Sequence, residues 1–204
     1  MKILKFDLNK MAVVIVCITT FCSCSKKLTF SENEIQLIGL DSTAGIMPIY
    51  TVDDPADTVI LNAVSSDLSV KDMKSDYYKI LKKRLLATVQ DSANPGVGIA
   101  APQVGVSKRL VAVQRFDKPG EPFELYSNIK LVSLSQDKAW GWEGCLSVPG
   151  KRDTVLRSKS VVISYIDDKD LKEKKDTVEG YTAVIFQHEV DHLDGILYTE
   201  RKKL

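Results

Sequence analysis

The sequence predicts a single α+β domain in which antiparallel or mixed sheets surround a central helix. The chain has 204 residues, 44% of them hydrophobic, which is enough to bury one core. Strand-like segments outnumber helical ones, and both histidines fall in one late helical stretch. The segments expected to form strands are 109–116, 123–132, 160–166 and 172–185, and the polar stretches 117–123 and 167–174 are expected to form turns.

The overall charge narrows the classes of partner. The formal net charge is +1, so the sequence gives no reason to expect binding to nucleic acid. The chain also shows no internal repeat and no low-complexity run. A globular domain acting on a small or extended ligand fits these features.

The first 23 residues have the pattern of a secretion signal. Residues 1–10 contain three lysines, and residues 11–23 form an uncharged run of thirteen residues. Such a run is short for a membrane span but suits the apolar region of a signal peptide. With Ser23 before Cys24, the segment resembles a bacterial lipoprotein signal, in which the cysteine receives lipid and becomes the first mature residue. The alternative is a buried N-terminal helix.

This pattern predicts a signal peptide at 1–23, a tether at 24–45 and the folded domain at 46–204. The expected location is therefore outside the cytoplasm, with the protein anchored to a membrane by lipid on Cys24. A cytoplasmic protein with a misread start is the alternative.

A helix is expected over residues 74–91, followed by the glycine-rich stretch GVGIAAPQVG at 96–105. These glycines lack the spacing of a dinucleotide-binding loop and follow a helix instead of a strand, which disfavours phosphate binding. Gln103 is a polar amide among small apolar residues. It is either an exposed loop glutamine or an amide directed at a reacting carbonyl.

Cys145 is the only cysteine outside the N-terminal segment, which holds Cys17, Cys22 and Cys24. A lone cysteine is usually a small buried hydrophobic residue. Here it lies in WGWEGCLSVPG, residues 140–150, among glycines, a proline and a carboxylate. Such a setting indicates a backbone that approaches something closely.

His188 and His192 lie four residues apart, so on a helix they share one face, with Glu189 beside the first. Gly195 is placed to end that helix. A hydrolytic metal site needs three protein ligands and one open position. No histidine follows His192, so the third ligand is expected upstream, with the thiolate of Cys145 as the candidate.

Together, the stretches GVGIAAPQ, EGCLS and QHEVDH resemble, in order and spacing, the three motifs of peptide deformylases. The resemblance covers about residues 48–200 and implies a peptide-deformylase-like fold. It also implies one divalent metal ion, Fe(II) in the cell or else Zn, Ni or Co, held by Cys145, His188 and His192. The reaction implied is hydrolysis of N-formylmethionyl peptides to formate and a free N-terminal methionine.

The resemblance also assigns catalytic roles. A bound metal makes hydroxide available near neutral pH, and Glu189 accepts the water proton and passes it to the leaving amine. The side-chain amide of Gln103 and the backbone N–H of Leu146 meet the negative charge of the tetrahedral oxyanion. Glu143 and Asp191 flank ligands and are candidates to orient them, although a solvated carboxylate is the simpler reading of Asp191.

Substrate recognition is implied less directly. The family binds its peptide as an added strand, for which the backbone of Gly98 offers hydrogen bonds. Residues at family positions around the methionine side chain are Val97, Tyr181, Val184 and Ile185, with the basic Arg152 nearby. The apolar members could equally be ordinary core residues.

Two other functions share parts of this pattern. A metallopeptidase would use the same metal and Glu189 but cleave internal amides; a cysteine ligand and the absence of a downstream ligand count against it. A non-catalytic lipoprotein that binds formyl-peptides would keep the groove and lose the chemistry. Retention of Glu189 counts against that reading.

Overall fold

The computed structural model describes residues 28–39, 45–93 and 95–201. The expected signal peptide at 1–23 and Cys24, which is expected to carry lipid, lie outside these residues. None of the helices described is both long enough and apolar enough to cross a membrane.

Two antiparallel sheets form the frame of the molecule, as expected for an α+β chain. The larger sheet has five strands in the order β1-β2-β3-β6-β7, and β4 and β5 pair with each other in a separate hairpin. The strand bounds are β1 Gly98–Ala100, β2 Leu110–Gln114, β3 Phe123–Leu134, β4 Lys138–Cys145, β5 Val148–Ser158, β6 Ser160–Ile166 and β7 Glu173–Glu179. The hairpin was not among the predicted strands, because WGWEG contains glycines that weaken a strand signal.

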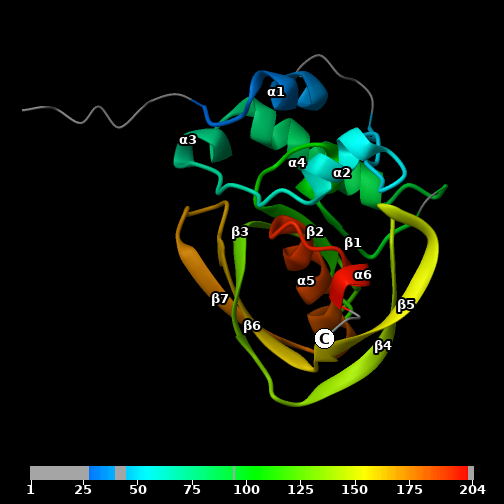
Figure 1. Cartoon of the computed structure of the whole chain (residues 1–204). Helices are drawn as coiled ribbons and strands as arrows, with labels where there is room; N and C mark the ends of the chain where they lie inside the picture. Colours follow the sequence, from blue (N-terminus) through cyan, green and yellow to red (C-terminus); the bar gives the residue numbers. More distant parts are fainter. Residues whose placement is uncertain (1–27, 40–44, 94, 202–204) are drawn as a thin grey trace, which may run out of the picture.

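Helix α5, Gly180–Leu193, lies at the centre of the molecule between the five-stranded sheet and the β4–β5 hairpin (Figure 1). Its apolar side chains, including Phe186, Val190 and Leu193, pack against buried residues of β2, β3, β6 and β7. The short helix α6, Tyr198–Arg201, follows a turn at Gly195. Gly195 has φ +71°, and a Cβ there would lie 2.5 Å from the carbonyl oxygen of Asn62, so glycine is required where the helix ends.

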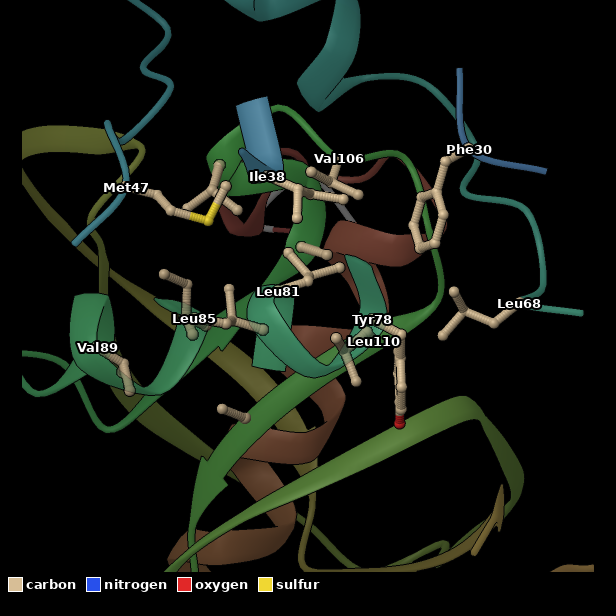
Figure 2. Close-up of a cluster of buried hydrophobic side chains, with 14 of the residues drawn as sticks. Phe30, Ile38, Met47, Leu68, Tyr78, Leu81, Leu85, Val89, Val106 and Leu110 are labelled. Atoms are coloured by element: carbon tan, nitrogen blue, oxygen red, sulfur yellow. The ribbon is translucent and has the colours of Figure 1, made fainter. Parts of the chain in front are cut away.

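A helical layer covers the other side of the large sheet. It consists of α1 Glu32–Ile38, α2 Pro55–Leu61, α3 Val70–Met73 and α4 Asp76–Val89, and β1 is followed by a 3-10 turn, Ala101–Val104. The predicted helix at 74–91 is thus confirmed as α4. Figure 2 shows its Leu81 and Leu85 converging with Ile38 and Val106 in the apolar cluster beneath this layer. The glycine-rich segment 96–105 packs against this cluster.

The segment 172–185 was predicted as one strand, and its second half is wrong. β7 ends at Glu179, and α5 begins at Gly180, where φ is +65°. The residues Tyr181 to Ile185 have high β propensity, but the chain reverses at Gly180 and burial of the α5 faces decides their conformation. Local propensity was therefore overridden by packing.

Part of the segment expected to act as a tether is packed onto the domain. Residues 28–39 contain α1, which begins with a capping box at Ser31 and Glu34 and buries Ile38 completely. Glu34 also accepts a hydrogen bond from the backbone N–H of Ser107 (2.9 Å), and Lys108 donates to the carbonyl of Thr29 (2.8 Å). These residues belong to the fold.

Candidate metal centre

The three predicted metal ligands meet in one place. Cys145 is the last residue of β4, and His188 and His192 stand one turn apart on α5. The candidate ligand atoms of the three residues all lie within 4.8 Å of one another, and the Cys145 Sγ lies 3.1 Å from the His192 Nε2. Because metal–sulfur and metal–nitrogen bonds are about 2.0–2.3 Å long, one ion can bond to all three atoms.

His188 is oriented by a carboxylate. Its Nδ1 donates to Oε2 of Glu143 at 2.8 Å, which leaves Nε2 facing the other ligands. The same carboxylate accepts two hydrogen bonds from Arg157, at 2.8 and 3.0 Å. Burial raises the pKa of Glu143, but the bonds from His188 and Arg157 outweigh it and lower the pKa to about 2. Glu143 is therefore ionised and fixes the tautomer of His188.

Asp191 extends this network away from the ligands. Its Oδ2 accepts a hydrogen bond from Nη1 of Arg157 at 2.6 Å, and its Oδ1 accepts one from Nη2 of Arg201 at 2.6 Å. With 4% of its surface exposed, Asp191 is buried, so the reading of it as a solvated carboxylate was wrong. It acts on Glu143 only through Arg157, whose side chain joins the two acids.

Sequence reasoning missed Arg157. The residue is 6% exposed and lies on β5 two positions after the buried Val155, on the same side of the strand. A charged residue at an inward position of a strand was the available signal, because such a group is stable only with buried partners.

The pKa values of the two histidines shift in opposite directions. It lowers the pKa of His192 well below its usual value, and the neighbouring His188 adds to this, so His192 is neutral and its lone pair is available. Burial also lowers the pKa of His188, but hydrogen bonds to Cys145 and Glu143 reverse the shift and raise the pKa to about 10. A metal ion and a proton compete for Nε2 of His188.

Glu189 is 3% exposed, and burial raises its pKa to about 7. A Cβ built at Gly98 would lie 2.4 Å from Oε1 of Glu189 and 2.8 Å from Cγ2 of Ile185. Gly98 is thus required for space. The other oxygen, Oε2, is buried and makes no hydrogen bond to the residues described.

Gln103 is buried, which excludes the exposed-loop alternative. Its Oε1 accepts from the backbone N–H of Ala100 at 2.8 Å, so its Nε2 must point the other way. Nε2 donates to Oγ of Ser147 (3.2 Å) and to Sγ of Cys145 (3.5 Å). The amide donor is therefore held beside the ligand atoms.

A cavity of about 480 Å³ opens beside this cluster. The predicted substrate residues all line it: Val97, Gly98, Arg152, Tyr181, Val184 and Ile185, together with Gln103, Leu146 and Glu189. Of these residues, Ile185 is buried, whereas Tyr181 and Arg152 are exposed. Trp142, which sequence reasoning did not single out, also lines the cavity.

Comparison with known proteins agrees with this geometry. The family model described as "Polypeptide deformylase" matches residues 46–204. The chain belongs to the peptide deformylase family. A curated peptide deformylase of Leptospira biflexa is 37% identical over 151 residues, which cover 71% of this chain and 83% of the relative.

Solved peptide deformylases have the same fold. The actinonin-bound class I type b enzyme of Acinetobacter baumannii has a TM-score of 0.67 and 32% identity, covering 78% of this chain and 99% of the other. The same enzyme with Met-Ala-Ser bound has a TM-score of 0.67 and 33% identity, covering 76% and 98%. The chain is therefore a metal-dependent hydrolase of a family that removes the formyl group from N-formylmethionyl peptides.

Proposed function

We propose that Cys145, His188 and His192 hold one divalent ion, Fe(II) in the cell, beside which N-formylmethionyl peptides are hydrolysed. The observation that carries this proposal is the convergence of one cysteine sulfur and two imidazoles next to the buried Glu189. Such a donor set accepts Fe, Zn, Ni or Co, so the resident metal depends on supply. When bound, the ion supplies Lewis acidity, which polarises the formyl group and acidifies water.

Glu189 is the group that moves the proton. Its carboxylate lines the cavity, and Oε2 has no hydrogen-bond partner among the residues described, so it can accept a proton from water. It then delivers that proton to the amine that leaves as the new N-terminus. Because Gly98 has no side chain, the Glu189 carboxylate has space beside it for this proton transfer.

Gln103 and Leu146 stabilise the oxyanion that forms when the formyl carbon becomes tetrahedral. The amide of Gln103 already points its donor at the ligand cluster, because Ala100 holds its oxygen. Leu146, whose backbone N–H is the second donor, follows Cys145 directly and lines the same cavity. Donors fixed before the reaction need no reorganisation as the charge develops.

The substrate binds as an extended strand between two strand edges. β1 is the first strand of the large sheet and β4 pairs only with β5, so among the strands described each has one open edge, and residues of both line the cavity. The backbone at Gly98 offers hydrogen bonds to such a peptide. Val97, Val184 and Ile185 surround the methionine side chain, and Tyr181 and Arg152 stand at the mouth.

The protein is exported and anchored to a membrane through lipid on Cys24. Three lysines, a short apolar run and Ser23 before Cys24 support this. Labelling cells with a lipid precursor tests it: label in the membrane fraction that disappears in Cys24→Ala is expected. Unlabelled protein in the cytoplasmic fraction would contradict it.

The reaction is tested with formyl-Met-Ala-Ser and the full-length protein purified without oxygen. We expect release of formate and Met-Ala-Ser, with metal bound, and loss of both metal and turnover in Cys145→Ala. Cleavage between methionine and alanine would indicate a metallopeptidase instead. Metallated protein that releases no product would point to a binding protein.

A further inference from the structure

The chain enters the fold at Thr29, where the side chains of two buried charged residues hold it. The backbone N–H and the hydroxyl of Thr29 donate to the two carboxylate oxygens of Asp72, at 2.8 and 2.6 Å, and Nζ of Lys108 donates to its carbonyl at 2.8 Å. Asp72 lies on α3, and the next residue of the chain, Phe30, is buried in the apolar cluster beneath the helical layer. The N-terminal segment is therefore fixed to the domain from Thr29 onward.

This fixed entry point leaves a short connection to the proposed lipid. The four residues Ser25 to Leu28 separate Cys24 from Thr29. Fully extended, the five steps between those two Cα atoms span at most about 18 Å. A lipid on Cys24 thus holds Thr29 within that distance of the membrane surface. The end of the domain that carries Thr29 is the end nearest the lipid.

The surface beside Thr29 is apolar and basic. On α3, Val70 is 56% exposed, and Lys71 and Lys74 are exposed and make no ion pair with the residues described. These three residues form the α3 patch. Lysines attract the anionic headgroups of a bilayer, and an exposed apolar side chain can enter the headgroup layer.

The acidic residues near the α3 patch do not cancel its charge. Two of its acidic neighbours in the sequence, Asp67 and Asp76, are paired with lysines at 3.3 and 2.8 Å. Glu32, in the first turn of α1, is exposed and leaves one negative charge. Lys26 and Lys27 add two positive charges just before the fold, so the excess charge at this end of the domain is positive.

The catalytic cavity lies at the other end of α4. This helix begins at Asp76, directly after the α3 patch, and its 14 residues make it about 21 Å long. At its last residue, the carbonyl of Val89 accepts a hydrogen bond from the backbone N–H of Gly96, which lines the cavity (3.0 Å). Figure 2 shows Phe30 and Val89 on opposite sides of the cluster that α4 covers. The length of α4 therefore separates the cavity from the entry point of the chain.

We propose that the α3 patch rests on an anionic bilayer surface and that α4 holds the catalytic cavity away from that surface, open to water. The proposal rests on the lipid anchor at Cys24 and the deformylase function given above. The tether is shorter than α4, so it favours this orientation, and the lysines of the patch bind the headgroups. The substrates that reach the cavity are then formyl-peptides dissolved beside the membrane.

The two tryptophans of the chain show where the cavity end lies. Trp140 and Trp142 are exposed on β4 by 61% and 67%, and Trp142 lines the cavity. The full-length, lipidated and metallated protein is inserted into vesicles of phosphatidylglycerol and phosphatidylcholine whose acyl chains carry bromine, which quenches indole fluorescence on contact. We expect no quenching of the native tryptophans. Formate release from formyl-Met-Ala-Ser should equal that of the same protein in detergent, since lipid does not cover the cavity.

A tryptophan at Val70, in a background of Trp140→Phe and Trp142→Phe, shows where the other end lies. The single indole of Val70→Trp should be quenched by the brominated lipid. Val132→Trp in the same background is the matched control, because Val132 is also an exposed valine (50%) but lies near the end of β3 that leads to the hairpin. Its fluorescence should not change.

The charge of the α3 patch is tested in the Val70→Trp protein. Lys71→Glu with Lys74→Glu should weaken the contact at least about 25-fold, since each lysine contributes roughly fivefold, and quenching should fall to the Val132→Trp level. Lys138→Glu with Lys151→Glu makes the same charge change on the hairpin and should leave the quenching unchanged. An equal loss in both double variants overturns the proposal.

Three other results would overturn the orientation in protein that carries lipid. They are quenching of the native tryptophans, equal quenching at Val70 and Val132, and no quenching at Val70. Wild-type protein without lipid would contradict the anchor at Cys24 instead. Lipidated, metallated protein that releases no formate either on vesicles or in detergent would contradict the deformylase function, so the three failures are distinguishable.

Discussion

The two faces of α5 are buried to a similar degree but are built from different chemistry. Phe186, Val190 and Leu193 face the five-stranded sheet and need only close packing. His192, Asp191 and, beside them, His188 face the hairpin, and Asp191 and His188 have charged partners. A buried polar group is costly unless it is paired, so the polar face can exist only because β4 and β5 supply Glu143 and Arg157.

This difference separates stability from chemistry within one helix. A buried ionic network contributes little net stability compared with apolar residues of similar size. Its presence on α5 is therefore explained by the metal ligands that it orients. Changes on the apolar face should lower stability alone, and changes on the polar face should alter metal binding or turnover.

The largest effect is expected from Arg157→Leu. It leaves Glu143 and Asp191 buried without their shared partner, which should lower the free energy of unfolding by about 3–5 kcal/mol and weaken metal affinity. Denaturation and metal titration measure the two quantities. Arg115→Leu is the control: Arg115 is also buried and paired, with Asp117 and Asp176, and its loss should destabilise without changing metal affinity. Equal metal affinity in both variants would contradict the claim that the polar face of α5 supports metal binding and not stability alone.

On the apolar face, Leu193→Ala should cost about 3 kcal/mol of unfolding free energy, because it leaves a cavity under a fully buried side chain. Metal content of the folded protein should remain at the wild-type level. Metal loss before the unfolding transition would show that the two faces are not separable.

Gly98→Ala should reduce kcat about 100-fold, because the added methyl group displaces the Glu189 carboxylate from its position. Bound metal should be retained. Gly141→Ala is the matched control, since a Cβ at Gly141 meets no atom within 4 Å. Full activity in Gly98→Ala would mean that turnover does not require the Glu189 carboxylate to occupy the place it has beside Gly98.

Glu143→Gln should weaken metal affinity about 10- to 100-fold with a smaller change in unfolding, since the amide still fills the space beside His188 but lacks the charge. Competition with a chelator measures the affinity. Unchanged affinity would mean that Glu143 serves the fold alone.

The candidate ligands could be proposed from the sequence, two of them because their spacing is local and the third by elimination. His188 and His192 are one helical turn apart, and Cys145 was the only cysteine left in the body of the chain. Gln103 was also found, since an amide among small apolar residues stands out. The family resemblance then joined motifs separated by roughly forty residues.

Among the supporting residues, Glu143 and Asp191 were candidates because they flank ligands, but Arg157 was missed, because tertiary packing creates the contacts that join the three. Arg157 meets Glu143 across the hairpin and Asp191 from another element, 14 and 34 residues away. The start of α5 was missed because Thr182, Val184 and Ile185 favour strands locally. Trp142 carried no motif at all, and only the cavity distinguishes it from Trp140.

The central claim is that the polar face of α5 forms a catalytic metal centre in which Glu189 carries the proton. Formate release and metal content measured together on Glu189→Gln test it most directly. The account predicts wild-type metal content with turnover reduced about 10²- to 10⁴-fold. Wild-type turnover by the metallated variant would contradict it.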